Sequence, residues 1–166
     1  PEPAWIVIPL GTGGTVAGLL AGLRLAGLDT RVVAVTATRA PTTWRPVVKR
    51  LARGVTQRIA QESGERDAAQ VRLDGLRIEA GWLGPGFGRE SAAGSKAQAM
   101  VEDLEGFQLD PVYNAKSMSA LIDLSQAGSL PGPILFWHTY NAIPLPEPDA
   151  SVVDLIPGSL RRLCNL

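Results

Sequence analysis

Apolar residues along the chain occur either in short continuous runs or at helical spacing. Continuous apolar runs bounded by glycine, proline or polar residues are typical of strands buried on both faces of a parallel sheet. They predict strands at residues 4–8, 31–36 and 134–137, with a weaker one at 76–79. Apolar residues spaced i, i+3, i+4 and i+7 indicate helices that pack one face on a sheet. They predict helices at residues 14–27, 91–105 and 115–127, and a further one from a cap at Thr42 or Thr43 to Ile59.

Strands and helices alternate throughout this pattern, which predicts an α/β fold: an open, mostly parallel twisted sheet with helices on both faces. Polar residues at 62–75 predict a connection with a short helical piece, and the glycines at 81–88 predict a loop. Periodicity is lost after residue 143, so we expect one α/β domain at 1–143 and an irregular tail at 144–166. A chain of 166 residues with 45% hydrophobic content is long enough for one such domain.

Composition narrows the possible partners and surroundings. The 16 basic and 16 acidic residues balance, so no overall charge favours a nucleic acid or an anionic membrane. The single cysteine, Cys164, excludes an internal disulfide and a cysteine metal cluster, and we expect no metal and a reducing, cytoplasmic setting. No apolar run approaches the roughly 18 residues that span a bilayer. The sequence begins at Pro1 and enters a strand within a few residues, from which we expect a fragment or a processed chain.

The most informative motif is a glycine-rich turn between the first strand and the first helix. It consists of Gly11, Thr12, Gly13, Gly14 and Thr15. Such a turn places unpaired backbone N–H groups at the positive end of the helix dipole, where a phosphate binds well. Glycines let the backbone approach the anion, and the two threonine hydroxyls add donors. The alternative is a turn that needs glycine only for positive φ angles.

The spacing of residues in this turn argues against two classes of phosphate-binding motif. A P-loop requires lysine after its last glycine, but Gly18 is followed by Leu19. A dinucleotide fingerprint requires glycine or alanine at the position of Val16, and an acid at the end of the second strand, where the chain has residues 36–39 without one. Both classes are therefore disfavoured. A compact phosphate monoester remains, and pyridoxal phosphate is a common cofactor of that kind.

Three further segments, read with the turn, carry a resemblance to a known family. They are residues 84–88 (GPGFG), 109–118 (LDPVYNAKSM) and 134–139 (ILFWHT). Together they resemble the family of 1-aminocyclopropane-1-carboxylate deaminase and D-cysteine desulfhydrase, over residues 5 to 139. This resemblance implies the large domain of a fold-type-II, tryptophan synthase β-like enzyme that depends on pyridoxal phosphate.

The resemblance also implies roles for individual residues. The turn Gly11–Thr15 would hold the cofactor phosphate, and Thr139 would face the pyridine nitrogen. Tyr113 would lie beside the substrate, where a phenol can hold or relay a proton. Without the resemblance, a half-buried structural tyrosine is the favoured interpretation of this residue. Asn114 follows it at a cofactor-binding position, and Phe87 lies at a substrate-pocket position.

Departures from the family pattern refine the expected reaction. Family members commonly have tyrosine at the position of Phe87, and a glycine pair where this chain has Tyr140 and Asn141. The deaminases have an acid at the position of Asn114, and a neutral residue leaves the ring a weaker electron sink. The sequence therefore favours β-elimination, as in D-cysteine desulfhydrase, over opening of the cyclopropane ring.

The family's covalent lysine lies in an N-terminal half that precedes the first strand seen in this chain. None of the three lysines, Lys49, Lys96 and Lys116, is at that position. We therefore expect the chain to be the C-terminal, cofactor-phosphate-binding part of a lyase or deaminase for a small amino acid. Its expected partners are the missing N-terminal half, the substrate and further copies in a homo-oligomer. The alternative is an inactive homologue or fragment that binds a phosphate ligand or a partner protein.

Overall fold

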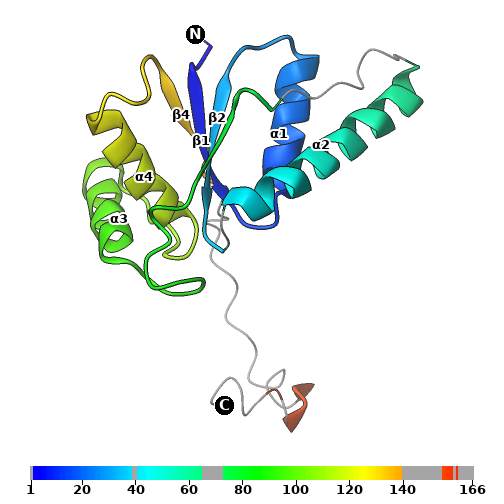
Figure 1. The fold of residues 1–166 in the computed structure, drawn as a ribbon. Coiled ribbons are helices and arrows are strands. Elements are labelled where there is room, and N and C mark those ends of the chain that lie inside the picture. Colours follow the sequence, from blue (N-terminus) through cyan, green and yellow to red (C-terminus); the bar gives the residue numbers. More distant parts are fainter. Residues whose placement is uncertain (1, 39–40, 65–72, 140–154, 159, 161–166) are drawn as a thin grey trace.

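The computed structural model describes residues 2–38, 41–64, 73–139, 155–158 and 160. Within them the elements follow one another as β1 (Trp5–Leu10), α1 (Gly14–Leu25), β2 (Arg31–Thr36), α2 (Pro41–Ser63), β3 (Leu76–Glu79), α3 (Ala92–Glu105), α4 (Asn114–Gln126) and β4 (Ile134–Phe136). The strands form a parallel sheet in the order β3-β2-β1-β4 (Figure 1). The parallel sheet and the alternating helices confirm the predicted α/β class.

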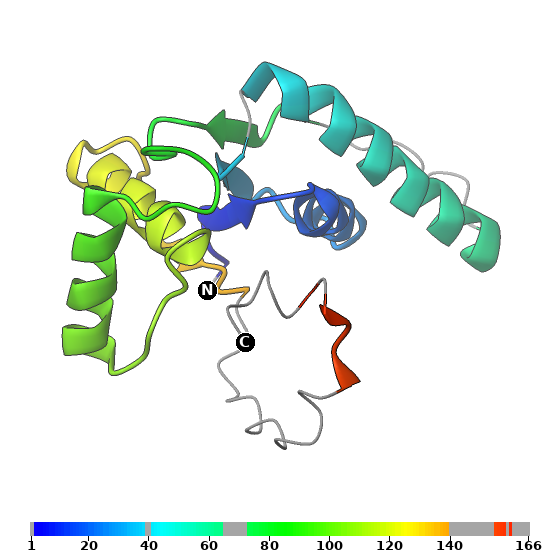
Figure 2. The ribbon, with the colours of Figure 1, turned by 90° about the horizontal axis from the view of Figure 1, so that it is seen from below.

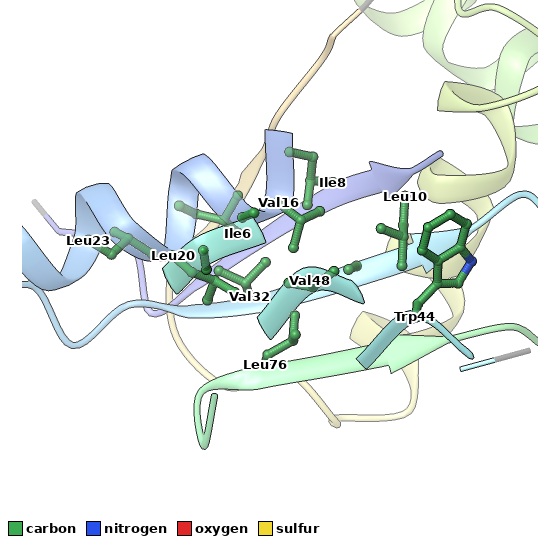
Figure 3. Close-up of a cluster of buried hydrophobic side chains, with 13 residues drawn as sticks. Ile6, Ile8, Leu10, Val16, Leu20, Leu23, Val32, Trp44, Val48 and Leu76 are labelled. Atoms are coloured by element: carbon green, nitrogen blue, oxygen red, sulfur yellow. The ribbon is translucent and has the colours of Figure 1, made fainter. Parts of the chain in front are cut away.

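Helices cover both faces of this sheet, with α1 and α2 on one side and α3 and α4 on the other (Figures 1 and 2). All six residues of the central strand β1 are buried. Ile6 and Ile8 pack into a cluster with side chains from α1 and α2 (Figure 3), whereas Trp5 and Val7 pack with α4. Successive side chains of a strand point to opposite faces, so burial on both faces requires the uninterrupted apolar run seen in the sequence.

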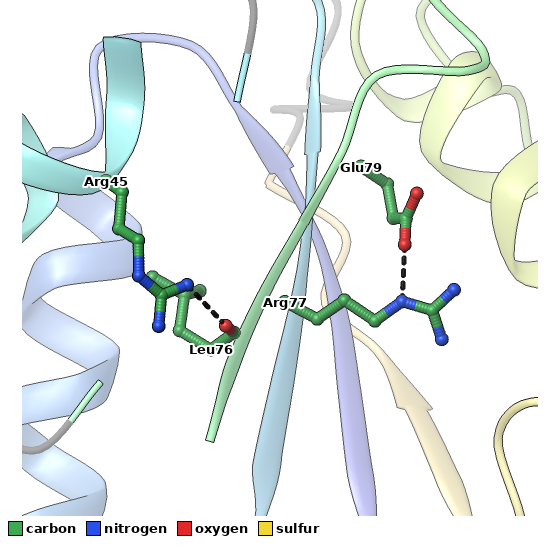
Figure 4. Close-up of polar contacts among 4 residues, drawn as sticks. All are labelled: Arg45, Leu76, Arg77 and Glu79. Atoms are coloured by element: carbon green, nitrogen blue, oxygen red, sulfur yellow. Dashed lines mark hydrogen bonds and ion pairs between the residues drawn. The ribbon is translucent and has the colours of Figure 1, made fainter. Parts of the chain in front are cut away.

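The outer strand β3 is held by an arginine from α2. Arg45 donates from Nη1 to the carbonyl oxygen of Leu76 at 3.1 Å (Figure 4). Its Nη2 donates to the carbonyl oxygen of Leu73 at 2.9 Å. On the strand itself, Arg77 donates a hydrogen bond to the carboxylate of Glu79. Together with the parallel pairing of β3 with β2, the Arg45 contacts hold a segment with a weak strand pattern at the edge of the sheet.

Every predicted strand and helix is present, with ends that differ by at most four residues, and the largest difference is in α2. The helix begins at Pro41, so Thr42 and Thr43 lie in its first turn and neither caps it. Proline suits the first helical position because it lacks the N–H that would be left unpaired there. The helix also continues past Ile59 to Ser63. The connection at 62–75 and the tail at 144–166 fall largely outside the described residues.

One further property concerns membranes. Within the part of the chain that the structure describes, no helix is both long and apolar enough to cross a bilayer.

Candidate functional site

The glycine turn lies at the carboxyl end of β1 and opens α1. Gly13 precedes the helix with a φ of 88° in the left-handed region, and its carbonyl oxygen accepts from Ala17 N at 2.9 Å. A Cβ atom on Gly13 would lie 3.3 Å from Val48 Cγ2 of α2. Glycine is therefore favoured here by both φ and space. The first N–H groups of α1 have no acceptor within the helix, which leaves them available to an anion.

A second segment approaches the turn from the start of α4. The Asp110 carboxylate accepts hydrogen bonds from the backbone N–H groups of Val112 (3.1 Å), Tyr113 (2.7 Å) and Asn114 (3.0 Å). It also accepts one from Asn114 Nδ2 at 2.5 Å. A carboxylate suits the positive end of a helix, where unpaired N–H groups gather. Asp110 thus holds the backbone N–H of Tyr113, and it holds Asn114 through both its backbone N–H and its side-chain amide.

The two segments line one cavity of about 540 Å³. The predicted residues that line it are Gly11, Thr12, Gly13, Gly14, Thr15, Tyr113, Asn114 and Thr139. They come from the turn after β1, the start of α1, the start of α4 and the segment after β4, so residues distant in the sequence meet at the carboxyl edge of the sheet. Ligands of open α/β sheets bind at this edge.

Tyr113 forms part of the cavity wall and is packed on two sides. A Cβ atom on Gly11 would lie 3.2 Å from Tyr113 Cε1, so the ring rests close against the backbone of the turn. Phe87 packs against the Tyr113 ring as well, with ring centroids 6.0 Å apart at 65°. Phe87 is itself 59% exposed and is not among the residues that line the cavity. The structure therefore places Phe87 beside Tyr113, one layer outside the cavity.

Asn114 carries an unsatisfied acceptor at the cavity. Its residue is 1% exposed, and Oδ1 has no hydrogen-bond partner within the described part of the chain. The orientation of the amide is fixed chemically, because only Nδ2 can donate to the Asp110 carboxylate. A buried polar atom without a partner is costly, about 1–3 kcal/mol.

Sequence reasoning missed the part played by Asp110. Asp110 was noted only as one residue of the segment 109–118, which carries the resemblance. The signal was present, because an aspartate just before a predicted helix is a common acceptor for the first N–H groups.

A larger cavity, of about 710 Å³, lies at the opposite edge of the sheet. It is lined by the first residues of three strands, Trp5, Arg31 and Leu76, and by none of the predicted site residues. The Arg31 guanidinium already stacks over the Trp5 ring, 5.1 Å from its centroid. We place the candidate site in the 540 Å³ cavity, because the glycine turn, Tyr113, Asn114 and Thr139 all line it.

The fold and this cavity define the class: an α/β protein with a glycine-rich turn at the carboxyl edge of a parallel sheet. A family model described as pyridoxal-phosphate dependent enzyme matches residues 1–139. The chain therefore belongs to this family, whose cofactor is pyridoxal phosphate. The predicted family and cofactor are confirmed.

Individual relatives agree with this assignment. The chain is 35% identical to D-cysteine desulfhydrase of Salmonella schwarzengrund (strain CVM19633) over 142 residues, which cover 82% of this chain and 40% of the relative. It is 34% identical to D-cysteine desulfhydrase of Salmonella typhi, with the same coverage. A crystal structure of an ACC deaminase homologue superposes with a TM-score of 0.69 at 29% identity, covering 84% of this chain and 40% of that one. The chain thus spans about 40% of the length of these relatives.

Proposed function

We propose that this chain binds pyridoxal 5′-phosphate in the 540 Å³ cavity and forms one part of a lyase for a small amino acid. The observation that carries the proposal is that the glycine turn lines one cavity together with Tyr113, Asn114 and Thr139. The turn offers N–H donors to a phosphate, and Asn114 offers an acceptor to a polar hydrogen on the ligand. A phosphorylated ring compound has both groups.

The predicted site residues of the cavity divide the work of binding and proton transfer in this proposal. The N–H groups of Gly13–Thr15 and the hydroxyls of Thr12 and Thr15 bind the phosphate. Asn114 and Thr139 orient the ring through an amide oxygen and a hydroxyl. When bound, the cofactor supplies an electron-withdrawing ring that stabilises negative charge on the α-carbon of an amino acid. The Tyr113 phenol, held in the cavity wall, holds or moves a proton near that carbon.

The reaction we favour is β-elimination, as the names of the relatives suggest. Asn114 accepts a hydrogen bond but brings no negative charge, so it stabilises a protonated ring less than a carboxylate does. D-cysteine is then converted, with water, to pyruvate, hydrogen sulfide and ammonia. The complete enzyme is expected to release hydrogen sulfide and pyruvate from D-cysteine, measured colorimetrically. Release of 2-oxobutanoate from 1-aminocyclopropane-1-carboxylate instead would contradict this choice.

A covalent attachment of the cofactor requires a lysine from outside this chain. Lys49 and Lys96 are exposed on α2 and α3, and Lys116 Nζ is bound to two loop carbonyls. None of the three lines the cavity. We propose that the remaining part of the enzyme supplies this lysine. We also propose that the enzyme is located in the cytoplasm. The same observation favours a second candidate, a protein that binds a phosphate ligand without catalysis.

Binding can be tested without the covalent lysine. The probe is 4′-deoxypyridoxine 5′-phosphate, which keeps the ring and phosphate but has no aldehyde to react with surface lysines. Isothermal titration calorimetry is expected to show one site per chain for this probe, and weaker binding of inorganic phosphate. Pyridoxine, which lacks the phosphate, is the control and is expected not to bind. Equal binding of pyridoxine would contradict the role of the turn.

The Asn114→Leu variant tests the acceptor in the same assay. Removing one ligand hydrogen bond costs about 1.4 kcal/mol, or tenfold in affinity. The probe is expected to bind about tenfold more weakly, whereas inorganic phosphate, which does not extend to Asn114, is expected to bind unchanged. Equal losses for both ligands would show that the variant disturbs the whole cavity and would contradict a specific contact to the ring.

A further inference from the structure

Lys116, in the first turn of α4, is a buried lysine without a part in the chemistry described above. Its residue is 0% exposed, and it is the largest of the fully buried side chains. Nζ donates to the carbonyl oxygens of Leu83 at 2.8 Å and Gly86 at 2.9 Å. Burial lowers the pKa of the Lys116 ammonium. Both contacts persist in either protonation state, because a neutral amine still has two N–H bonds.

Both acceptors belong to the glycine-rich loop at residues 81–88. Gly84, Gly86 and Gly88 have φ angles of 64°, 135° and 72°, which side chains rarely adopt. A segment so rich in glycine loses much conformational freedom when it is ordered, so it needs contacts that hold it. The loop is attached to α4 at its start by Trp82 Nε1, which donates to Asp123 Oδ2 at 2.6 Å. Lys116 provides the attachment further along.

The attached segment leads directly to the cavity wall. Phe87 follows Gly86, whose carbonyl oxygen Lys116 binds, and its ring lies against Tyr113. Tyr113 in turn rests against Gly11 of the turn. A continuous set of contacts therefore runs from the Lys116 amine through Phe87 to a side chain that lines the cavity.

A purely space-filling role does not explain a lysine at this position. Burying an amine is costly even when it is hydrogen-bonded, and an apolar side chain of similar length would pack at least as well. What the lysine adds is two directed hydrogen bonds to carbonyl oxygens three residues apart.

We propose that Lys116 is a positioning residue: it holds Leu83–Phe87 so that Phe87 supports Tyr113 at the edge of the cofactor cavity. The proposal rests on the proposed function only for the identity of the ligand. Lys116 touches neither the turn nor Asn114 through any of its hydrogen bonds, so its influence is confined to the Tyr113 side of the cavity.

The test compares Lys116→Met with Lys96→Met, which removes an exposed lysine from α3. Two readouts are used: trypsin cleavage after the exposed Arg89, just beyond the loop, and calorimetric binding of 4′-deoxypyridoxine 5′-phosphate and of inorganic phosphate. Lys116→Met is expected to be cleaved at Arg89 at least fivefold faster and to bind the ring-bearing probe about fivefold more weakly. Its affinity for inorganic phosphate is expected to stay unchanged, and Lys96→Met is expected to match the parent chain throughout.

Lys116→Arg, which keeps the N–H donors, is expected to restore part of the probe affinity. If Lys116→Met does not fold, Phe87→Ala decides, because Phe87 is exposed and its loss leaves the core intact. That variant is expected to show the same selective loss of probe affinity. Parent-like cleavage and binding in Lys116→Met, or parent-like binding in Phe87→Ala, would overturn the proposal. A parent chain that binds neither ligand would instead refute the proposed function, while the cleavage rates still report on the loop.

Discussion

Replacing Gly13 with valine is expected to abolish detectable binding of phosphate ligands and to destabilise the chain. The backbone φ of 88° costs a side-chain-bearing residue about 1–2 kcal/mol, and a β-branched residue more. The added Cβ would also lie 3.3 Å from Val48 Cγ2. The two methyl groups of the new valine extend beyond that Cβ and would need further space. Relief of both strains requires the turn to move, which removes the N–H groups from the anion. Urea unfolding is expected to show that the free energy of unfolding falls by about 2 kcal/mol. Calorimetry is expected to detect no heat of binding for phosphate.

Gly18→Ala is the matched control, because this glycine is inside α1 and a Cβ there would meet no atom within 4 Å. Alanine in a helix interior is favoured over glycine by about 1 kcal/mol, so this variant is expected to be slightly more stable and to bind as before. Phosphate affinity retained in Gly13→Val would show that the turn is not the anion site.

The Asp110→Ala variant is expected to cause the largest loss of stability of those considered. Its carboxylate accepts three backbone N–H groups and the Asn114 amide. Loss of such an acceptor at a helix start costs up to about 2 kcal/mol, and the stranded amide of Asn114 adds about 1 kcal/mol. The expected sum, about 3 kcal/mol, is measurable by urea unfolding. Probe affinity falls as well, because Tyr113 and Asn114 lose their backbone anchor.

Asp103→Ala is the matched control, since Asp103 is exposed on α3. It is expected to change stability by less than about 0.5 kcal/mol. A similar small change in Asp110→Ala would mean that the four hydrogen bonds contribute little, and that Tyr113 and Asn114 are held by packing alone.

Much of the fold follows from local pattern. The run in β1 is apolar at every position because helices lie on both of its faces, and the stripe in α1 is apolar at Val16, Leu20 and Leu23 because it packs on that sheet. The order of the strands could not be predicted in this way, because no local pattern indicates that β4 pairs with β1 while β3 lies at the far edge. The start of α2 at Pro41 was missed because two threonines offered a more familiar cap.

The candidate site could likewise be predicted only in part. The glycine turn could be predicted from its place between a strand and a helix, where parallel sheets gather functional groups. Tyr113, Asn114 and Thr139 were predicted only through the resemblance to a known family. Their individual roles stay predictions. Lys116 could not be recognised, because a lysine in the first turn of a helix gives no sign that it is buried. Its importance depends on a loop that begins more than thirty residues earlier in the chain.

The pairing of β4 with β1 has a consequence for the order of folding. Trp5 lies opposite Arg31 of β2 on one side and Ile134 of β4 on the other, so β1 can pair with β2 early but meets β4 only when nearly all the described chain has been synthesised. Contacts so distant in sequence form late, because their loop-closure entropy must be met before they contribute stability. Thr139 follows β4 and therefore joins the turn and Asn114 last. A nascent chain would present the anion-binding turn early but acquire a complete cavity only at this final step, so ligand capture could serve as a readout of finished folding.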